Sequence, residues 1–169
     1  MKRVIGIDPG SQRTGWGIVE TSGTRSTYVA SGVIDLRKFE VLSTRLGSLA
    51  DQIERVLQDY EPNLAAIESV FHGKNAKSAL ILGQARGAAI SVIGRSELEC
   101  VELSPAEIKL SVAGHGKADK IQVAQMVERL LRIEVKGTSD ESDALAIAIA
   151  GGSMIATSTH AWLAKQGIR

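Results

Sequence analysis

Three apolar segments of this chain have carboxylates directly at one end, and this pattern restricts the folds that the chain can adopt. The run Val-Ile-Gly-Ile ends at Asp8, and the run Leu-Ala-Ala-Ile ends at Glu68. In a third segment, Asp140 and Asp143 stand immediately before Ala-Leu-Ala-Ile-Ala. Ionised carboxylates beside apolar walls lose hydration and repel one another. The fold must therefore place these acids at the edge of its core, next to something that compensates their charge.

A divalent cation is the simplest compensating ligand. Carboxylate oxygens suit Mg²⁺ or Mn²⁺, and such ions commonly catalyse phosphoryl transfer. Asp8 alone is also explained by the turn at Pro9-Gly10, and acids in the first turn of a helix stabilise it by about 0.3–1 kcal/mol. Glu68 is harder to explain in this way, because Glu is uncommon at the end of a buried strand. Jointly, the four acids predict a metal-dependent site.

The periodicity of the chain changes from strands to helices. Strands are predicted over residues 3–8, 15–20, 26–36, 64–67 and 99–103. Helices are predicted over residues 42–60, 77–92, 105–114, 121–131 and 138–150. The start of the third helix is well marked, because Ser104 and Glu107 have capping-box spacing and Pro105 fits the first turn.

This order of elements predicts an α/β domain over residues 1–152, with a five-stranded mixed sheet flanked by helices. The regular pattern weakens after Gly151-Gly152, so residues 153–169 are expected to form a loosely ordered tail. A helix precedes the strand at 64–67, which is therefore expected to lie parallel to the first strand through a right-handed crossover.

This topology brings the acids together. Ligand sites in such sheets lie beyond the carboxyl ends of the parallel strands, where Asp8 and Glu68 fall. Neighbouring strands lie about 4.8 Å apart, so both carboxylates could share one metal. Asp140 and Asp143 are three residues apart on a helix and hence lie on one face.

Basic residues gather in two places, although the net charge of the chain is only +1. The first stretch, residues 69–96, contains no acid and carries four bases, Lys74, Lys77, Arg86 and Arg95. A basic surface beside an acidic site suits a metal-dependent nuclease, but four bases in such a stretch are also common on an ordinary solvated face.

The second basic group, Lys109, Lys117 and Lys120, surrounds the loop that contains His115. This loop precedes a predicted helix, whose free amides could bind phosphate. A lone loop histidine is usually just solvated, so His115 is left out of the catalytic set.

The composition indicates a protein that is not inserted in a membrane. No apolar run reaches the roughly 18 residues that a spanning helix needs. The single cysteine, Cys100, cannot form an internal disulfide, which fits a reducing compartment. We therefore expect a cytoplasmic location.

Several segments, in their order and spacing, resemble one known family. They are Ile5-Gly-Ile-Asp-Pro-Gly-Ser11 with Thr14-Gly15, Ala66-Ile67-Glu68 with Val70-Phe71, Lys74-Asn75, Ser78-Ala79-Leu80 with Leu82-Gly-Gln-Ala-Arg-Gly87, and Asp140-Glu-Ser-Asp143-Ala-Leu-Ala-Ile-Ala148. The chain resembles the RuvC family of bacterial Holliday-junction resolvases, which have a ribonuclease-H-like fold. The resemblance extends to about Ala150.

The resemblance implies a homodimeric endodeoxyribonuclease that cuts a four-way DNA junction with two symmetric nicks during recombination and DNA repair. On that basis Asp8, Glu68, Asp140 and Asp143 bind two Mg²⁺ ions, for which Mn²⁺ would substitute. One ion would help to generate and orient the attacking hydroxide, and the other would stabilise the leaving 3′ oxygen. The products would carry a 5′-phosphate and a 3′-hydroxyl.

The resemblance also implies contacts with DNA and with other proteins. Phe71 would stack on an unpaired base near the crossover, a contact worth about 1–3 kcal/mol, although a loop aromatic can also fold back into the core. Phosphates would be held by Lys74, Lys77, Lys109, Lys117 and Lys120. The RuvA–RuvB branch-migration complex would be a partner in bacteria, at the nucleoid.

Four small residues are spaced by four along the second predicted helix: Ala79, Gly83, Gly87 and Ser91. Their bare ridge could form the dimer interface, which two symmetric cuts require, or pack against the sheet of the same chain.

Two other functions compete with the nuclease. The strand–Asp–Gly–turn opening is related to that of actin and sugar-kinase phosphotransferases, but these need a second domain of comparable size, for which 169 residues leave no room. A junction-binding protein without cleavage is the other alternative, and the presence of all four acids disfavours it.

Overall fold

The computed structural model describes residues 1–23, 25–69, 76–135 and 137–165. Its strands are β1 (Lys2–Asp8), β2 (Arg13–Ser22), β3 (Arg25–Asp35), β4 (Leu64–Glu68) and β5 (Cys100–Leu103). Its helices are α1 (Leu42–Tyr60), α2 (Ala76–Arg95), α3 (Pro105–Ala113), α4 (Lys120–Leu131) and α5 (Ser139–Lys165). Every predicted element is therefore present in the predicted order.

The five strands form one mixed sheet in the order β3-β2-β1-β4-β5. The pairs β1–β2 and β2–β3 are antiparallel, whereas β1–β4 and β4–β5 are parallel. The mixed sheet and the parallel pairing of β1 with β4 confirm the prediction. The two parallel pairs are joined by crossovers through α1 and α2, as parallel strands require.

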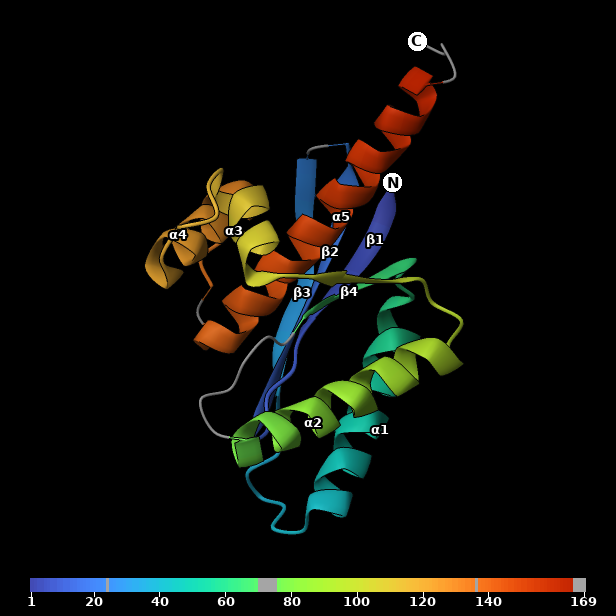
Figure 1. Ribbon diagram of the computed structural model, residues 1–169, viewed down its shortest axis with the longest axis vertical. Helices are drawn as coiled ribbons and strands as arrows, with labels where there is room; N and C mark the ends of the chain where they lie inside the picture. Colours follow the sequence, from blue (N-terminus) through green and yellow to red (C-terminus); the bar gives the residue numbers. More distant parts are fainter. Residues whose placement is uncertain (24, 70–75, 136, 166–169) are drawn as a thin grey trace.

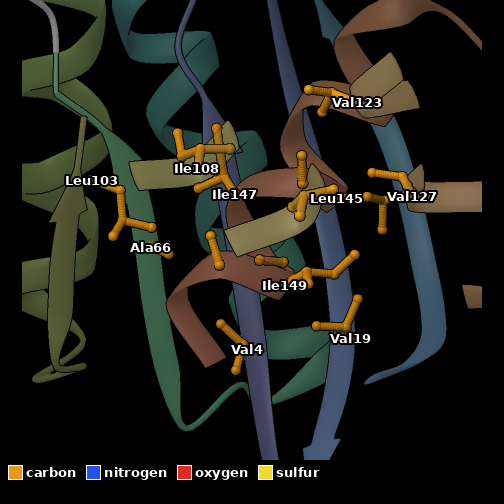
Figure 2. Close-up of a cluster of buried hydrophobic side chains, with 14 of the residues drawn as sticks. Val4, Val19, Ala66, Leu103, Ile108, Val123, Val127, Leu145, Ile147 and Ile149 are labelled. Atoms are coloured by element: carbon orange, nitrogen blue, oxygen red, sulfur yellow. The ribbon is translucent and has the colours of Figure 1, made fainter. Parts of the chain in front are cut away.

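Helices cover both faces of the sheet (Figure 1). Successive side chains of a strand point to opposite faces, and β1 separates the two cores in this way. Ile5 and Ile7 belong to a buried cluster with residues of α1 and α2. Val4 belongs to a second cluster with residues of α3, α4 and α5, part of which is drawn in Figure 2. The core is almost wholly aliphatic, as the low aromatic content predicts.

Helix boundaries follow the local sequence signals. At α3, Ser104 Oγ accepts from the Glu107 amide at 3.3 Å and Glu107 Oε2 accepts from the Ser104 amide at 2.8 Å, which confirms the capping box. A second capping box, between Asp119 and Gln122, begins α4. No described helix is both long and apolar enough to cross a bilayer.

Helix α5 continues through Gly151 and Gly152 to Lys165, past the end predicted near Ala150. The glycines serve close packing here. A Cβ on Gly151 would lie 2.6 Å from the Cβ of Ala66, and one on Gly152 would lie 2.5 Å from Cγ2 of Thr21. Both positions are therefore restricted to glycine by the contact between α5 and the sheet. The division into a domain over 1–152 and a tail over 153–169 stays a prediction.

Candidate active site

Strand alternation directs the carboxylates of Asp8 and Glu68 to the same face of the sheet. Val4 and Leu64 both belong to the core cluster on the α5 side, and they pair with each other in the β1–β4 register. Asp8 and Glu68 each lie an even number of residues further along their strands, so their side chains also face α5. The two acids end neighbouring parallel strands, as predicted.

The first turn of α5 is held directly above this strand end. Asp8 is paired with Gly15 across the β1–β2 ladder. A Cβ on Gly15 would lie only 2.0 Å from the carbonyl oxygen of Asp140, so only a glycine allows the helix to approach this closely. The contact brings Asp140 and Asp143 to the end of the sheet where Asp8 lies.

Three of the four acids open onto one pocket. Its volume is about 310 Å³, and Asp8, Glu68 and Asp143 line it. Two of the predicted DNA-binding residues, Lys109 and Lys120, line the same pocket. The remaining wall is largely apolar and comes from α3, α4 and α5: Pro105, Ile108, Val123, Ala146 and Ile147. The site therefore combines concentrated negative charge with a largely apolar wall.

The pocket strongly disfavours ionisation of Asp8. Burial, followed by the charges of Asp143, Glu68 and Asp140, raises the pKa of Asp8 from 3.8 to about 7, against an opposing effect of Lys120. The pKa of Glu68 is also raised, by burial and then by Asp143. The lysines that face the pocket therefore compensate the carboxylate charge only in part.

Lys120 supplies part of this compensation. Its ammonium lies 2.7 Å from Oδ2 of Asp143, although 63% of the lysine side chain is exposed. The hydrogen bond to Asp143 raises the pKa of Lys120. Lys120 is the first residue of α4, so this ion pair joins α4 to α5 at the mouth of the pocket.

Asp140 lies beside the pocket and does not line it. Its Oδ2 is 3.9 Å from Nη1 of Arg13 and accepts a hydrogen bond of 3.3 Å from Oγ1 of Thr138. The sequence predicted that Asp140 and Asp143 share a helix face, which agrees with this arrangement. The sequence did not predict the pairing of Arg13 with Asp140.

The donor chemistry of the pocket fits a divalent cation. It offers carboxylate oxygens from three elements, and a cation would lower the raised pKa values of Asp8 and Glu68. Within the described part of the chain, no group of three or more His, Cys, Asp or Glu side chains is already arranged around a common metal position. In this arrangement Asp143 is paired with Lys120.

The main chain of Glu68 has a partner that the sequence did not predict. Nε of Arg86 donates to the Glu68 carbonyl oxygen at 3.0 Å, and the same guanidinium forms an ion pair with Glu102. In the sequence, Arg86 is one of four bases in an acid-free stretch. Its position in the middle of α2, among small residues, gave no indication that it reaches the end of β4.

The structure describes some of the other predicted DNA-binding residues. Lys117 is exposed in the loop before α4, and Lys77 is exposed in the first turn of α2. Phe71 and Lys74 lie outside the described residues. His115 is exposed and lines a different pocket, together with Gln122 and Arg129.

The small ridge of α2 does not pack against its own sheet. Gly83 and Gly87 are exposed, and among the described residues a Cβ on either would meet nothing within 4 Å. The opposite side of the helix, with Ala85 and Ala89, is buried against the core. Packing against the described part of the chain therefore does not explain Gly83 and Gly87.

Comparison with known proteins identifies the family of this chain. The family model described as "Crossover junction endodeoxyribonuclease RuvC" matches residues 4–151. The chain belongs to the RuvC family. A RuvC of Dechloromonas aromatica is 47% identical over 148 residues, which are 88% of this chain and 83% of the relative. A RuvC of Thiobacillus denitrificans is 44% identical over 168 residues, 98% of each chain.

A solved structure supports the same assignment. RuvC of Thermus thermophilus in complex with a Holliday junction substrate is 29% identical, with a TM-score of 0.88 over 94% of this chain and 98% of that one. The match confirms the ribonuclease-H-like fold. As a member of the RuvC family the protein is an endodeoxyribonuclease, and its family and fold together imply dependence on a divalent metal. This membership argues against the phosphotransferase alternative.

Proposed function

We propose that this protein resolves four-way Holliday junctions in recombination and DNA repair, by two symmetric nicks that leave 5′-phosphate and 3′-hydroxyl ends. The single observation that carries this proposal is the pocket where Asp8, Glu68 and Asp143 meet Lys109 and Lys120. It supplies oxygen ligands for cations and bases for phosphates in one place. The similarity to a RuvC in complex with a Holliday junction supports the choice of substrate.

Asp8, Glu68 and Asp143 are proposed to hold two Mg²⁺ ions, with Asp140 as a further ligand from its place beside the pocket. When bound, the ions supply Lewis-acid activation of the attacking water and stabilise the charge that develops on the phosphorus centre and the leaving oxygen. The apolar wall around Ile108 and Val123 lowers the local polarity on one side of the site and so strengthens these interactions. Mn²⁺ is expected to substitute, because it accepts the same oxygen ligands.

The basic residues hold the DNA. Lys109 and Lys120 lie in the pocket itself, so their ammonium groups reach the phosphates next to the cleaved bond. Lys117, in the loop before α4, and Lys77, in the first turn of α2, are exposed and hold phosphates further along the strand. Phe71 and Lys74 are proposed for base stacking and phosphate contact on the strength of the family resemblance alone.

Two active sites are needed to cut two strands symmetrically, so the protein is proposed to act as a homodimer. The exposed ridge of α2 supports this, because Gly83 and Gly87 allow close approach and Leu80 is 65% exposed beside them. The RuvA–RuvB complex is proposed as a partner that moves the junction, in the bacterial cytoplasm at the nucleoid.

A synthetic four-way junction tests the proposal. The junction and a linear duplex of the same sequence are incubated with the protein, in Mg²⁺ or in chelator, and the nicks are mapped on each strand. Paired nicks that need the metal and are confined to the junction support the proposal. Tight junction binding without cleavage under any divalent metal would instead favour a protein that only binds junctions.

A further inference from the structure

We infer that Arg86 is a positioning residue for Glu68, and that through it helix α2 controls the geometry of the metal-binding pocket. This inference rests on the proposed function, in which Glu68 is a metal ligand. Arg86 touches no reacting atom. It acts by fixing the main chain from which the Glu68 carboxylate projects.

The Arg86 guanidinium joins three elements. Nε donates to the Glu68 carbonyl oxygen at the end of β4, and Nη2 pairs with the Glu102 carboxylate on β5. Only 19% of the Arg86 side chain is exposed, whereas 57% of the Glu102 side chain is exposed. A planar guanidinium can satisfy two acceptors in fixed directions, which a lysine ammonium on a flexible stem cannot do.

The hydrogen bond from Arg86 to Glu68 lies at the end of β4. Glu68 is the last residue of β4, and the following amide, that of Ser69, donates to the Leu103 carbonyl at 2.8 Å. The Glu68–Ser69 peptide is thus held on its N–H side by β5 and on its carbonyl side by Arg86. Rotation of this peptide would change the backbone torsions of Glu68 and redirect its side chain. With both contacts present, the carboxylate stays aimed into the pocket.

A purely stabilising role is less consistent with these contacts. An ion pair with a largely exposed glutamate contributes little to stability. The bond to the carbonyl is the more specific contact, since it reaches the one residue of β4 that lines the pocket. Arg86 also precedes Gly87 on the exposed ridge of α2. The helix proposed to contact a second subunit is therefore the helix that holds Glu68 in place.

Electrostatics and positioning make opposite predictions for a change at Arg86. Removal of a positive charge near a cation site should strengthen metal binding if charge alone matters. Loss of a positioning contact should weaken it, because residues that orient metal ligands typically contribute about 10–100-fold in affinity. The direction of the change therefore separates the two roles.

The test measures Mn²⁺ binding to the full-length protein without DNA, by electron paramagnetic resonance. The variants are Arg86→Gln and Arg86→Lys, and the control is Arg95→Gln, which removes an exposed arginine of the same helix that lies 3.9 Å from Glu54. We expect Arg86→Gln to weaken Mn²⁺ binding by about 10-fold and Arg86→Lys to weaken it less. Arg95→Gln should leave the affinity unchanged, and melting curves establish that each variant is folded.

Two results would overturn the inference: folded Arg86 variants that bind Mn²⁺ as tightly as the wild type or more tightly, or an equal loss in Arg95→Gln. If both Arg86 variants lose cooperative melting, the residue is a general stabiliser and the inference is also wrong. Glu68→Gln separates this failure from failure of the proposed function. Unchanged Mn²⁺ binding in Glu68→Gln would remove Glu68 from the metal site, whereas weakened binding there with intact binding in the Arg86 variants rejects only the role of Arg86.

Discussion

The ammonium of Lys120 lies 2.7 Å from Oδ2 of Asp143, at the mouth of the pocket that Asp8 and Glu68 also line. In this arrangement a lysine of α4 forms an ion pair with a carboxylate that the proposed function assigns as a metal ligand. On the proposed function, a bound cation would compete with the lysine ammonium for this oxygen and would free Lys120 to contact a DNA phosphate. Lys120 would thereby link the charge of the pocket to contact with the substrate.

Lys120→Gln should therefore strengthen Mn²⁺ binding in the absence of DNA while it slows junction cleavage. Loss of a competing charge at this partly exposed site should tighten binding by about fivefold, or about 1 kcal/mol. Titration with Mn²⁺ measures the affinity, and the nearby exposed Lys117→Gln serves as the control. Weaker Mn²⁺ binding in Lys120→Gln would contradict this competition.

The raised pKa of Asp8 predicts a pH-dependent stability of the metal-free protein. The pKa rises from 3.8 to about 7 on folding. At pH values between these two, the Asp8 carboxyl group is therefore protonated in the native state and ionised in the unfolded chain. Stability contributed by Asp8 is therefore present below about pH 4 and is lost as the pH rises to about 7. Asp8→Asn removes this loss. At pH 8 the free energy of unfolding of the variant should therefore be about 1–2 kcal/mol higher than that of the wild type.

Urea unfolding in chelator, at pH 5 and pH 8, measures this effect on the free energy of unfolding. The advantage of Asp8→Asn should be smaller at pH 5, where the carboxyl group of the native wild type is largely protonated. An advantage that is absent at pH 8, or equal at both pH values, would show that the Asp8 carboxylate is not destabilised by its surroundings.

Gly15→Ala should damage both stability and the site. The new Cβ would lie 2.0 Å from the Asp140 carbonyl oxygen, so α5 must move away from the sheet and carry Asp140 and Asp143 with it. Overpacking of this kind lowers the free energy of unfolding by about 1–3 kcal/mol. Gly47→Ala on α1 is the matched control, because its Cβ meets nothing within 4 Å, and it should stabilise by up to about 1 kcal/mol. Equal melting temperatures for the two variants would contradict the close contact.

Leu80→Glu should separate the proposed dimer without unfolding the chain. Leu80 is 65% exposed on α2, and a charge at the centre of an interface weakens association by about 10–100-fold. Sedimentation velocity over a range of concentrations measures the dissociation. Leu110→Glu is the control, since Leu110 is 57% exposed on α3, away from the ridge of α2. A dimer that survives Leu80→Glu but not Leu110→Glu would place the interface elsewhere.

The sequence predicted those parts of the site that depend on local patterns. Asp8 and Glu68 could be placed at neighbouring strand ends, because alternation and the helical crossover determine where each strand finishes. Ser104 and Glu107 could be recognised as a capping box in the same way. These signals arise within a few residues, so one sequence is enough to read them.

Features that depend on how elements pack were not predicted. The spacing of Asp140 and Asp143 places both on one helix face but does not give the rotation of that helix, which the contact at Gly15 determines. The extension of α5 past Gly151 was missed because glycine commonly ends a helix, whereas here it allows contact with Ala66. The bond from Arg86 to Glu68 links residues 18 positions apart on different elements and leaves no local pattern.

The most direct test of the central claim compares wild type with Asp8→Asn on one synthetic four-way junction in Mg²⁺, with binding and cleavage measured on the same samples. The pocket of acids is proposed to perform the chemistry while the lysines hold the DNA. Asp8→Asn should therefore bind the junction as tightly as the wild type and make no paired nicks. Normal cleavage by Asp8→Asn would contradict the account and place the active site elsewhere.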